Sequence, residues 1–195
     1  MLTRKYKVAA VLLTLGLLLS VQTGLFSWTP WYTPFGSNYL PAVMYANPNV
    51  NDECGNYGAF IRGARSWNRV QNNDFRFAYG GNQNRGAPIN DGYQIVIWTN
   101  NCDYGVLGVT YLLQNGPNRN CDLLMCLGWN WECGPGNPSY GEYDIESVVC
   151  HELGHVLGLG HSNTSQATMY YAISSGDASK RTLHQDDING LNAIY

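Results

Sequence analysis

The chain has 195 residues and a formal net charge of −3, and only 13% of its residues are charged. This length suits one well-packed domain and is too short for two domains of ordinary size. Because 11 basic residues face 14 acidic ones, we expect no basic patch for nucleic acid or for an anionic membrane surface.

The N-terminal residues have the pattern of an export signal. Three basic residues, Arg4, Lys5 and Lys7, precede an apolar run over residues 8–19. This run is shorter than the roughly 20 residues that a membrane span needs. We therefore expect residues 1–24 to be a signal peptide and the protein to be secreted, without stable membrane association once the signal is cleaved. An uncleaved anchor that continues through residues 25–26 is the alternative.

We expect one folded domain over residues 40–195, after a leader over residues 25–39 that is rich in Trp, Pro, Ser and Gly. Apolar residues three or four positions apart predict an amphipathic helix over residues 57–70. Alternating, β-branched and aromatic residues predict short strands over residues 42–45, 75–79, 93–98, 106–113 and 123–127. Gly80 and Gly81 are expected to end the second of these strands.

Two further helices are predicted in the last third of the chain, after a Gly/Pro loop over residues 134–141. Asp144 is a suitable N-cap, and Gly158 is expected to end that helix in the left-handed conformation. The buried side of this helix is expected to carry Ile145, Val148, Val149, Leu153 and Val156. Apolar residues at spacings of three predict a closing helix over residues 185–195, with His184 before it as a surface or capping residue.

Six cysteines follow the predicted signal, and an even number in an exported protein indicates up to three disulfides. Sequence alone does not choose among the pairings of Cys54, Cys102, Cys121, Cys126, Cys133 and Cys150. A structural zinc site on Cys121, Cys126 and Cys133 is the alternative, although these residues lack CxxC spacing.

The strongest motif is the stretch HELGHVLGLGH, residues 151–161. His151 and His155 lie four positions apart on a predicted helix, so both imidazoles can reach one metal ion. Glu152 lies one step round the helix, where it can contact a water on that ion without ligating the ion. The chain then turns back and can bring His161 up as a third ligand. Three nitrogen ligands and an open fourth position predict one catalytic zinc ion.

A structural cluster without metal is the alternative reading of these histidines. Three of the only four histidines in the chain fall within this stretch. Burying three imidazoles together without a metal costs desolvation and gains nothing in return. The spacing therefore favours a metal site.

HELGHVLGLGH resembles the extended zinc signature HExxHxxGxxH of the metzincin peptidases. Residues 167–170, with Met169, are similar to the methionine turn that lies beneath the metal in those enzymes. Ser162 and the segment 183–191, with its Asp-Asp pair, resemble the matrixin branch, the matrix metalloproteinases. The resemblance implies an α+β, zincin-like catalytic domain, in which a twisted, mostly parallel five-stranded sheet and three helices form a zinc cleft.

The same resemblance implies a zinc endopeptidase that acts on polypeptides, and we expect the protein to be secreted and monomeric. Zinc would be held by His151, His155 and His161, and Glu152 would be the general base of peptide hydrolysis. Two other functions stay open. One is a secreted binding module that uses zinc as a structural staple, and the other is a zinc hydrolase of small amides or glycans.

The chain also departs from the matrixin pattern. A cysteine-switch propeptide segment is not found ahead of residue 40, and Cys54 does not match it, so we do not expect latency by that mechanism. Only His184 remains for a second, structural zinc site, which we therefore do not expect. Calcium could be held by backbone carbonyls with Asp91, Asp103 or Asp122, although the sequence does not locate such a site.

Tyr171 stands two residues after Met169, where matrixins carry proline. This arrangement is similar to the Met-x-Tyr of astacins and serralysins, in which the tyrosine reaches the metal or the oxyanion. Tyr171 is therefore a candidate oxyanion partner or fifth ligand. The alternative is that Tyr170 and Tyr171 only line the wall of the substrate pocket.

Overall fold

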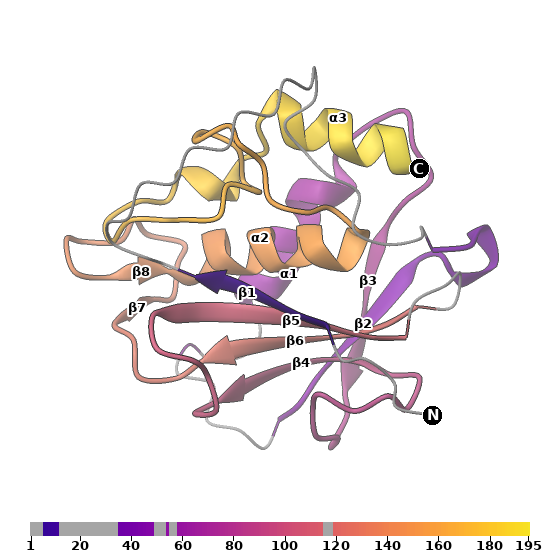
Figure 1. Ribbon diagram of the computed structural model, residues 1–195, viewed down its shortest axis with the longest axis horizontal. Coiled ribbons are helices and arrows are strands. Elements are labelled where there is room, and N and C mark those ends of the chain that lie inside the picture. Colours follow the sequence, from indigo (N-terminus) through magenta and orange to yellow (C-terminus); the bar gives the residue numbers. More distant parts are fainter. Residues whose placement is uncertain (1–5, 12–34, 49–53, 55–57, 115–118) are drawn as a thin grey trace.

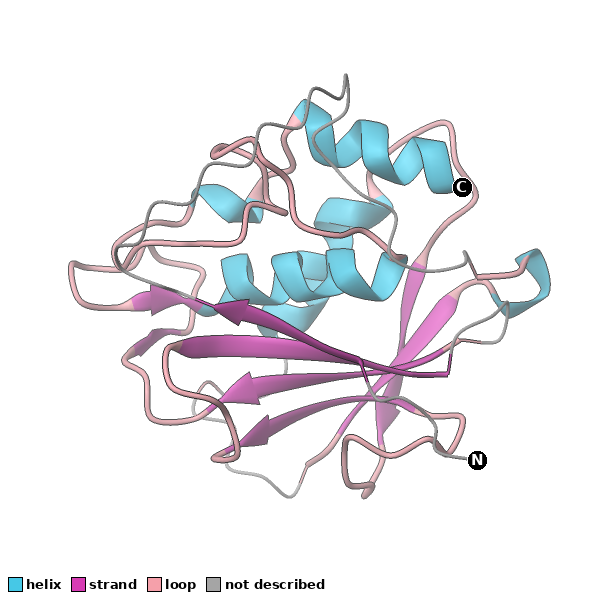
Figure 2. Ribbon diagram, in the orientation of Figure 1, coloured by secondary structure: helices cyan, strands magenta, loops and turns pink. Residues whose placement is uncertain are grey.

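A twisted sheet with helices packed on one face organises the computed structural model (Figures 1 and 2). The structure describes residues 6–11, 35–48, 54, 58–114 and 119–195. The strand order in the main sheet is β1-β5-β6-β4-β2-β3, and a separate two-stranded sheet joins β7 and β8. The strands are β1 (Tyr6–Val11), β2 (Ala42–Ala46), β3 (Phe77–Asn82), β4 (Gln94–Thr99), β5 (Val106–Gln114), β6 (Asn120–Cys126), β7 (Trp131–Glu132) and β8 (Tyr143–Asp144).

Five of these strands confirm the expected mostly parallel sheet. β2 pairs in parallel with β3 and β4, β4 pairs in parallel with β6, and β5 runs antiparallel to β6. β1 adds a sixth strand, antiparallel to the outer edge of β5, with Tyr6 opposite Leu112 and Val11 opposite Val106. The remainder of the predicted signal peptide, residues 1–5 and 12–24, lies outside the described residues, as does most of the predicted leader.

The central strands are mostly apolar because both faces of the sheet are covered. In β4, Val96 and Trp98 join the larger core beneath the helices, whereas Ile95 and Ile97 join a second cluster on the opposite face. Successive side chains of a strand point to opposite faces, so a strand buried on both sides carries apolar residues at most consecutive positions. The predicted strand over residues 93–98 is therefore a central strand.

Three helices lie on one side of the sheet: α1 (Gly58–Asn68), α2 (Ile145–Leu157) and α3 (Gln185–Ile194) (Figure 2). The single turns η1 (Ser37–Tyr39) and η2 (Ser179–Arg181) complete the regular structure. α1 packs against α2 and buries Phe60, Ala64 and Trp67, as its amphipathic pattern predicts. The Trp67 indole N–H donates to the Cys150 carbonyl at 2.9 Å, which fixes the two helices to each other.

Both predicted ends of α2 are confirmed. The Asp144 side chain accepts a hydrogen bond from the Ser147 N–H at 2.8 Å and so caps the first turn. Gly158 ends the helix with φ of 112°, a left-handed conformation that only glycine adopts at little cost. The helix therefore ends where the chain must turn back.

One predicted boundary is wrong, because Gly80 and Gly81 lie inside β3 and do not end it. β3 is an edge strand of the sheet, where a glycine costs few side-chain contacts. The ring of Tyr45 lies over Gly80, where a Cβ atom would approach the ring to 2.3 Å. The Tyr45 ring of the neighbouring strand β2 thus requires glycine at position 80.

Two disulfides are present among the described residues. Cys54–Cys133 joins the segment before α1 to the loop that follows β7, and Cys102–Cys126 joins the loop after β4 to the last residue of β6. Cys121 and Cys150 are buried free thiols. The alternative zinc site on three cysteines is wrong, since two of its three members are in disulfides. No helix in the described part of the chain is long and apolar enough to span a membrane.

Candidate metal centre

α2 places two imidazoles on its buried side, one helical turn apart. His151 Nδ1 lies 2.7 Å from the Thr168 carbonyl oxygen, and His155 Nδ1 lies 2.8 Å from the Leu159 carbonyl oxygen. A carbonyl oxygen only accepts hydrogen bonds, so each Nδ1 carries the ring hydrogen and each Nε2 carries a lone pair. Hydrogen bonds of this kind fix the tautomer and the orientation of metal-binding histidines.

The two Nε2 atoms face each other at 3.1 Å. Two lone pairs at this distance repel each other unless a cation lies beside them. The rings of His151 and His155 stand perpendicular, with centroids 4.7 Å apart. The donor chemistry of the pair therefore fits a metal ion that both nitrogens can reach.

His161 completes the group from the loop that follows Gly158. Its ring centroid lies 5.3 Å from that of His151 and 4.9 Å from that of His155. One ligand atom from each of the three histidines lies within 4.8 Å of the others. Among the described residues, no other group of three or more His, Cys, Asp or Glu side chains has this geometry. Three imidazoles with an open fourth position suit zinc.

All three histidines are neutral at physiological pH. Burial lowers the pKa of His151 to about 3 and that of His161 to about 4, and it also lowers the pKa of His155. Only a neutral imidazole has the lone pair that a metal needs. The buried environment therefore prepares these residues for metal binding.

Glu152 lies beside the histidines and is fully buried. Its Oε2 accepts a hydrogen bond from the Thr110 hydroxyl of β5 at 2.8 Å. Its Oε1 has no hydrogen-bond partner among the residues that the structure describes. Burial raises the pKa of Glu152 to about 8, and the bonds from Thr110 oppose this rise. A metal ion held by the three histidines would favour the charged carboxylate of Glu152 and so lower its pKa again.

Comparison with known protein families supplies an independent result: the matrixin family model matches residues 61–195, more than half of the chain. The chain belongs to the matrixin family. Its relatives include metalloendoproteinase 5-MMP of Arabidopsis thaliana, 54% identical over 52 residues, which is 27% of this chain and 14% of the relative.

Two longer matches come from different kingdoms. Metalloendoproteinase 4-MMP of Arabidopsis thaliana is 46% identical over 91 residues, 47% of this chain and 26% of the relative. Human matrix metalloproteinase-27 is 39% identical over 92 residues, 47% of this chain and 16% of the relative. The matches therefore span about a quarter or less of each of these relatives.

Met169 packs directly beneath α2 in this matrixin. It is fully buried, and a Cβ atom added to Gly154 would lie 2.1 Å from its sulfur. The Ser162 N–H donates to the Met169 carbonyl at 2.8 Å, which joins the residue after His161 to this turn. Glycine at position 154 is therefore required for the turn that carries Met169 to approach α2 this closely.

Gly154→Ala is expected to destabilise the protein by about 1–3 kcal/mol, because the added methyl group overpacks the contact with Met169 and Trp67. For a domain of this size the melting temperature falls by about 2–4 °C per kcal/mol. Thermal unfolding of the zinc-loaded protein measures the effect. Gly86→Ala is the control, since its Cβ would meet only the terminal methyl group of Ile89, an exposed side chain that can move aside. Equal melting temperatures for both variants would contradict this account of the contact.

Asp187 of α3 holds the same turn in place. Its carboxylate accepts hydrogen bonds from the backbone N–H groups of Thr168, Met169 and His184, at 2.8, 3.0 and 2.8 Å. The Thr168 carbonyl in turn faces His151 Nδ1, so a chain of contacts runs from α3 to a candidate metal ligand. His184 is the N-cap of α3, which confirms its predicted capping role.

Tyr171 lies near both His161 and Tyr170. Its ring centroid is 6.4 Å from that of His161 and 4.5 Å from that of Tyr170, and 44% of the residue is exposed. This position is compatible both with a role at the metal and with the pocket wall.

The acidic residues considered for calcium have other contacts. Asp91 pairs with Arg85 at 2.8 Å, and Asp122 accepts hydrogen bonds from the N–H groups of Ile89 and Ile95. Burial raises the pKa of Asp122 to about 7. Calcium binding through Asp91, Asp103 or Asp122 therefore stays a possibility without a located ligand set.

Thr110 was not among the predicted site residues, because nothing in a strand sequence indicates which side chain will contact Glu152. Its partner lies 42 positions along the chain.

Proposed function

We propose that this matrixin is a secreted zinc endopeptidase in which His151, His155 and His161 hold the metal and Glu152 is the general base. One observation carries the proposal: a buried carboxylate with an oxygen available on one side lies next to three neutral imidazoles that converge on one point.

Bound zinc would polarise the scissile carbonyl and lower the pKa of the attacking water to about 7. Glu152 Oε1 takes a proton from that water as it attacks the carbonyl carbon. The Thr110 hydroxyl keeps Oε2 engaged, so Oε1 is the atom that receives the proton. Glu152 then returns the proton to the leaving amine nitrogen, which ends the cycle with the carboxylate restored. Tyr171 is a candidate donor to the oxyanion of the tetrahedral intermediate, and Met169 supports the metal-binding helix from below.

An extended polypeptide is the substrate that suits this site. A peptide can add as a strand to a sheet edge, where main-chain hydrogen bonds give affinity and side-chain pockets give specificity. β5 carries Thr110 at the site, and its outer edge is paired with β1. Cleavage of a signal peptide over residues 1–24 would free that edge for substrate.

Two rival functions predict different results with the same protein. A binding module with structural zinc would retain the metal and cut nothing, and a hydrolase of small amides or glycans would act on small molecules far better than on polypeptides. The purified protein is therefore incubated with unfolded casein, a diverse peptide library and small amide and glycan substrates, with and without a zinc chelator. We expect chelator-sensitive cleavage of casein and peptides. Preference for the small substrates, or no cleavage of any substrate, would contradict the proposal.

Thr110→Val tests the positioning of the general base. The substitution keeps the shape of the side chain and leaves Oε2 of buried Glu152 without its hydroxyl partner, so kcat is expected to fall by about tenfold. Zinc content and KM should stay unchanged. The acid limb of the pH–rate profile should move to higher pH, because the Thr110 hydroxyl stabilises the charged carboxylate and its loss raises the pKa of Glu152. An unchanged profile with full activity would show that Thr110 has no such role.

A further inference from the structure

A pocket with about 320 Å³ of empty volume, part of it open to solvent, lies beside the metal ligand His151. Its walls include the apolar side chains of Leu107, Val148 and Ile173. Polar residues also line it, among them Ser147 from α2 and Lys180 from η2. A substrate side chain next to the scissile bond would enter this pocket, because His151 is both a metal ligand and part of its lining.

Lys180 is an unusual member of an apolar pocket. It is only 4% exposed, and lysine is almost never this deeply buried without a partner. Its ammonium group donates to the carbonyl oxygens of Ser165 and Ala167, the latter at 2.7 Å. An ammonium group has three hydrogens, so one remains after these two bonds. The nitrogen lies 5.4 Å from the ring centroid of Tyr170, another residue of the pocket lining.

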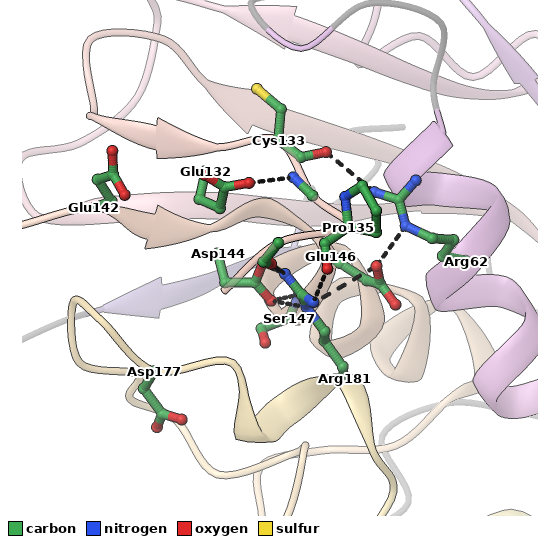
Figure 3. Close-up of polar contacts among 12 residues, drawn as sticks. Arg62, Glu132, Cys133, Pro135, Glu142, Asp144, Glu146, Ser147, Asp177 and Arg181 are labelled. Atoms are coloured by element: carbon green, nitrogen blue, oxygen red, sulfur yellow. Dashed lines mark hydrogen bonds and ion pairs between the residues drawn. The ribbon is translucent and has the colours of Figure 1, made fainter. Parts of the chain in front are cut away.

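The next residue fixes Lys180 in this position. Arg181 makes two hydrogen bonds to the Asp144 carboxylate, at 2.8 and 2.5 Å, and donates to the carbonyl oxygens of Pro135 and Gly136 (Figure 3). A two-pronged arginine–carboxylate pair restricts geometry more than a single contact does. η2 is therefore fastened to the N-terminus of α2, with Arg181 on the outer side of the turn and Lys180 in the pocket lining.

A second ion pair supports this arrangement from α1. Arg62 donates to Glu146 at 2.5 Å and to the carbonyl oxygen of Cys133 at 3.1 Å (Figure 3). The loop that carries Cys133 and Pro135 is thus held by one arginine from each side. This rigidity matters because a pocket selects among side chains only when its polar groups keep their positions.

Ser147 contributes the second polar group of the pocket. The residue is fully buried, and its hydroxyl has no hydrogen-bond partner among the residues that the structure describes. Its backbone N–H is already used by the Asp144 cap, so the hydroxyl is not needed to start the helix. Buried hydroxyls in proteins nearly always have a partner, and one that faces a pocket can be completed by a ligand.

We propose that Lys180 and Ser147 make this pocket selective for substrate side chains with an unbranched apolar stem and a terminal oxygen acceptor, namely glutamine or glutamate. The stem would lie against Leu107, Val148 and Ile173, and the terminal oxygen would accept from the Lys180 ammonium and the Ser147 hydroxyl. A leucine side chain would fill the apolar part and leave the Ser147 hydroxyl and the third Lys180 hydrogen without an acceptor in a water-poor site. This inference rests on the proposed endopeptidase function.

The test uses two series of peptides, one varied at the residue before the scissile bond and one at the residue after it. Each series carries glutamine, glutamate, leucine or norleucine at the varied position. We expect wild-type kcat/KM to be about tenfold higher with glutamine or glutamate than with leucine or norleucine at one of the two positions. A larger effect for glutamate than for glutamine would show that charge contributes. A preference for leucine or norleucine at both positions would overturn the inference.

Two variants assign the preference to residues. Lys180→Met keeps an unbranched stem, and we expect it to reverse the order in favour of norleucine and leucine. Ser147→Ala removes only a hydroxyl, and we expect it to lower the preference for glutamine and glutamate by about threefold, with zinc content unchanged. If Lys180→Met does not fold, Ser147→Ala and the wild-type series decide. If the variants that fold keep the wild-type preference, the assignment of that preference to Lys180 and Ser147 is overturned.

Casein keeps this test separate from the proposed function. Wild type that cuts casein but shows no preference for an oxygen acceptor would contradict the inference and leave the endopeptidase intact. Wild type that binds zinc and cuts neither casein nor any peptide would contradict the proposed function itself.

Discussion

Glu152→Gln is expected to bind about one zinc ion per chain and to lose casein cleavage by about 10²–10⁴-fold in kcat, the usual contribution of a general base. Glutamine has the same shape as glutamate and can still accept the hydrogen bond from Thr110, so the fully buried site should keep its structure. What it lacks is a basic oxygen that can take a proton from water. Steady-state cleavage of casein and elemental analysis of bound zinc, on the same samples, measure both quantities.

Glu142→Gln is the matched control for this variant. Glu142 lies shortly before α2, and its carboxylate accepts a hydrogen bond from the exposed Ser139 N–H at 2.7 Å. It should therefore retain wild-type activity. A Glu152→Gln protein that binds zinc and cuts casein as fast as the control would show that another group moves the proton.

His155→Ala is expected to weaken zinc binding by at least about 100-fold and to remove detectable cleavage. Losing only an outer-shell partner of a metal typically costs about 10–100-fold, and His155 is proposed to bind the metal directly. His155 is also completely buried, so the remaining cavity lowers stability as well. Zinc competition with a chelator of known affinity measures the first effect. Thermal unfolding with and without zinc measures the second, since zinc should stabilise only a protein that binds it.

His184→Ala is the control for the histidine series, because His184 is the N-cap of α3 and lies outside the metal group. It should lose some stability, about 1 kcal/mol for a lost cap, and keep its zinc affinity. Equal loss of zinc in the two variants would contradict the assignment of His155 as a ligand.

The parts that sequence predicted well depend on local geometry. Residues four apart on a helix always share a face, so His151 and His155 could be paired from their spacing alone. Asp144 and Gly158 mark the ends of α2 because capping depends on the residue itself and its immediate neighbours. The apolar runs of the central strands were predictable for the same reason.

The parts that sequence did not predict depend on contacts between distant segments. The pairing of Cys54 with Cys133 spans 79 positions, and no rule of spacing selects it. β3 continues through Gly80 because a ring from β2 lies over it, which no local pattern indicates. Thr110 and Lys180 become part of the site only when β5 and η2 pack beside α2.

The most direct test of the central claim is to return zinc stepwise to the metal-free protein while measuring bound zinc and casein cleavage together. We predict that cleavage rises in proportion to bound zinc and stops rising at about one ion per chain, as expected for one three-histidine catalytic site. Zinc bound at that ratio, with no cleavage of casein or of a diverse peptide library, would contradict the endopeptidase and favour a structural role for the metal.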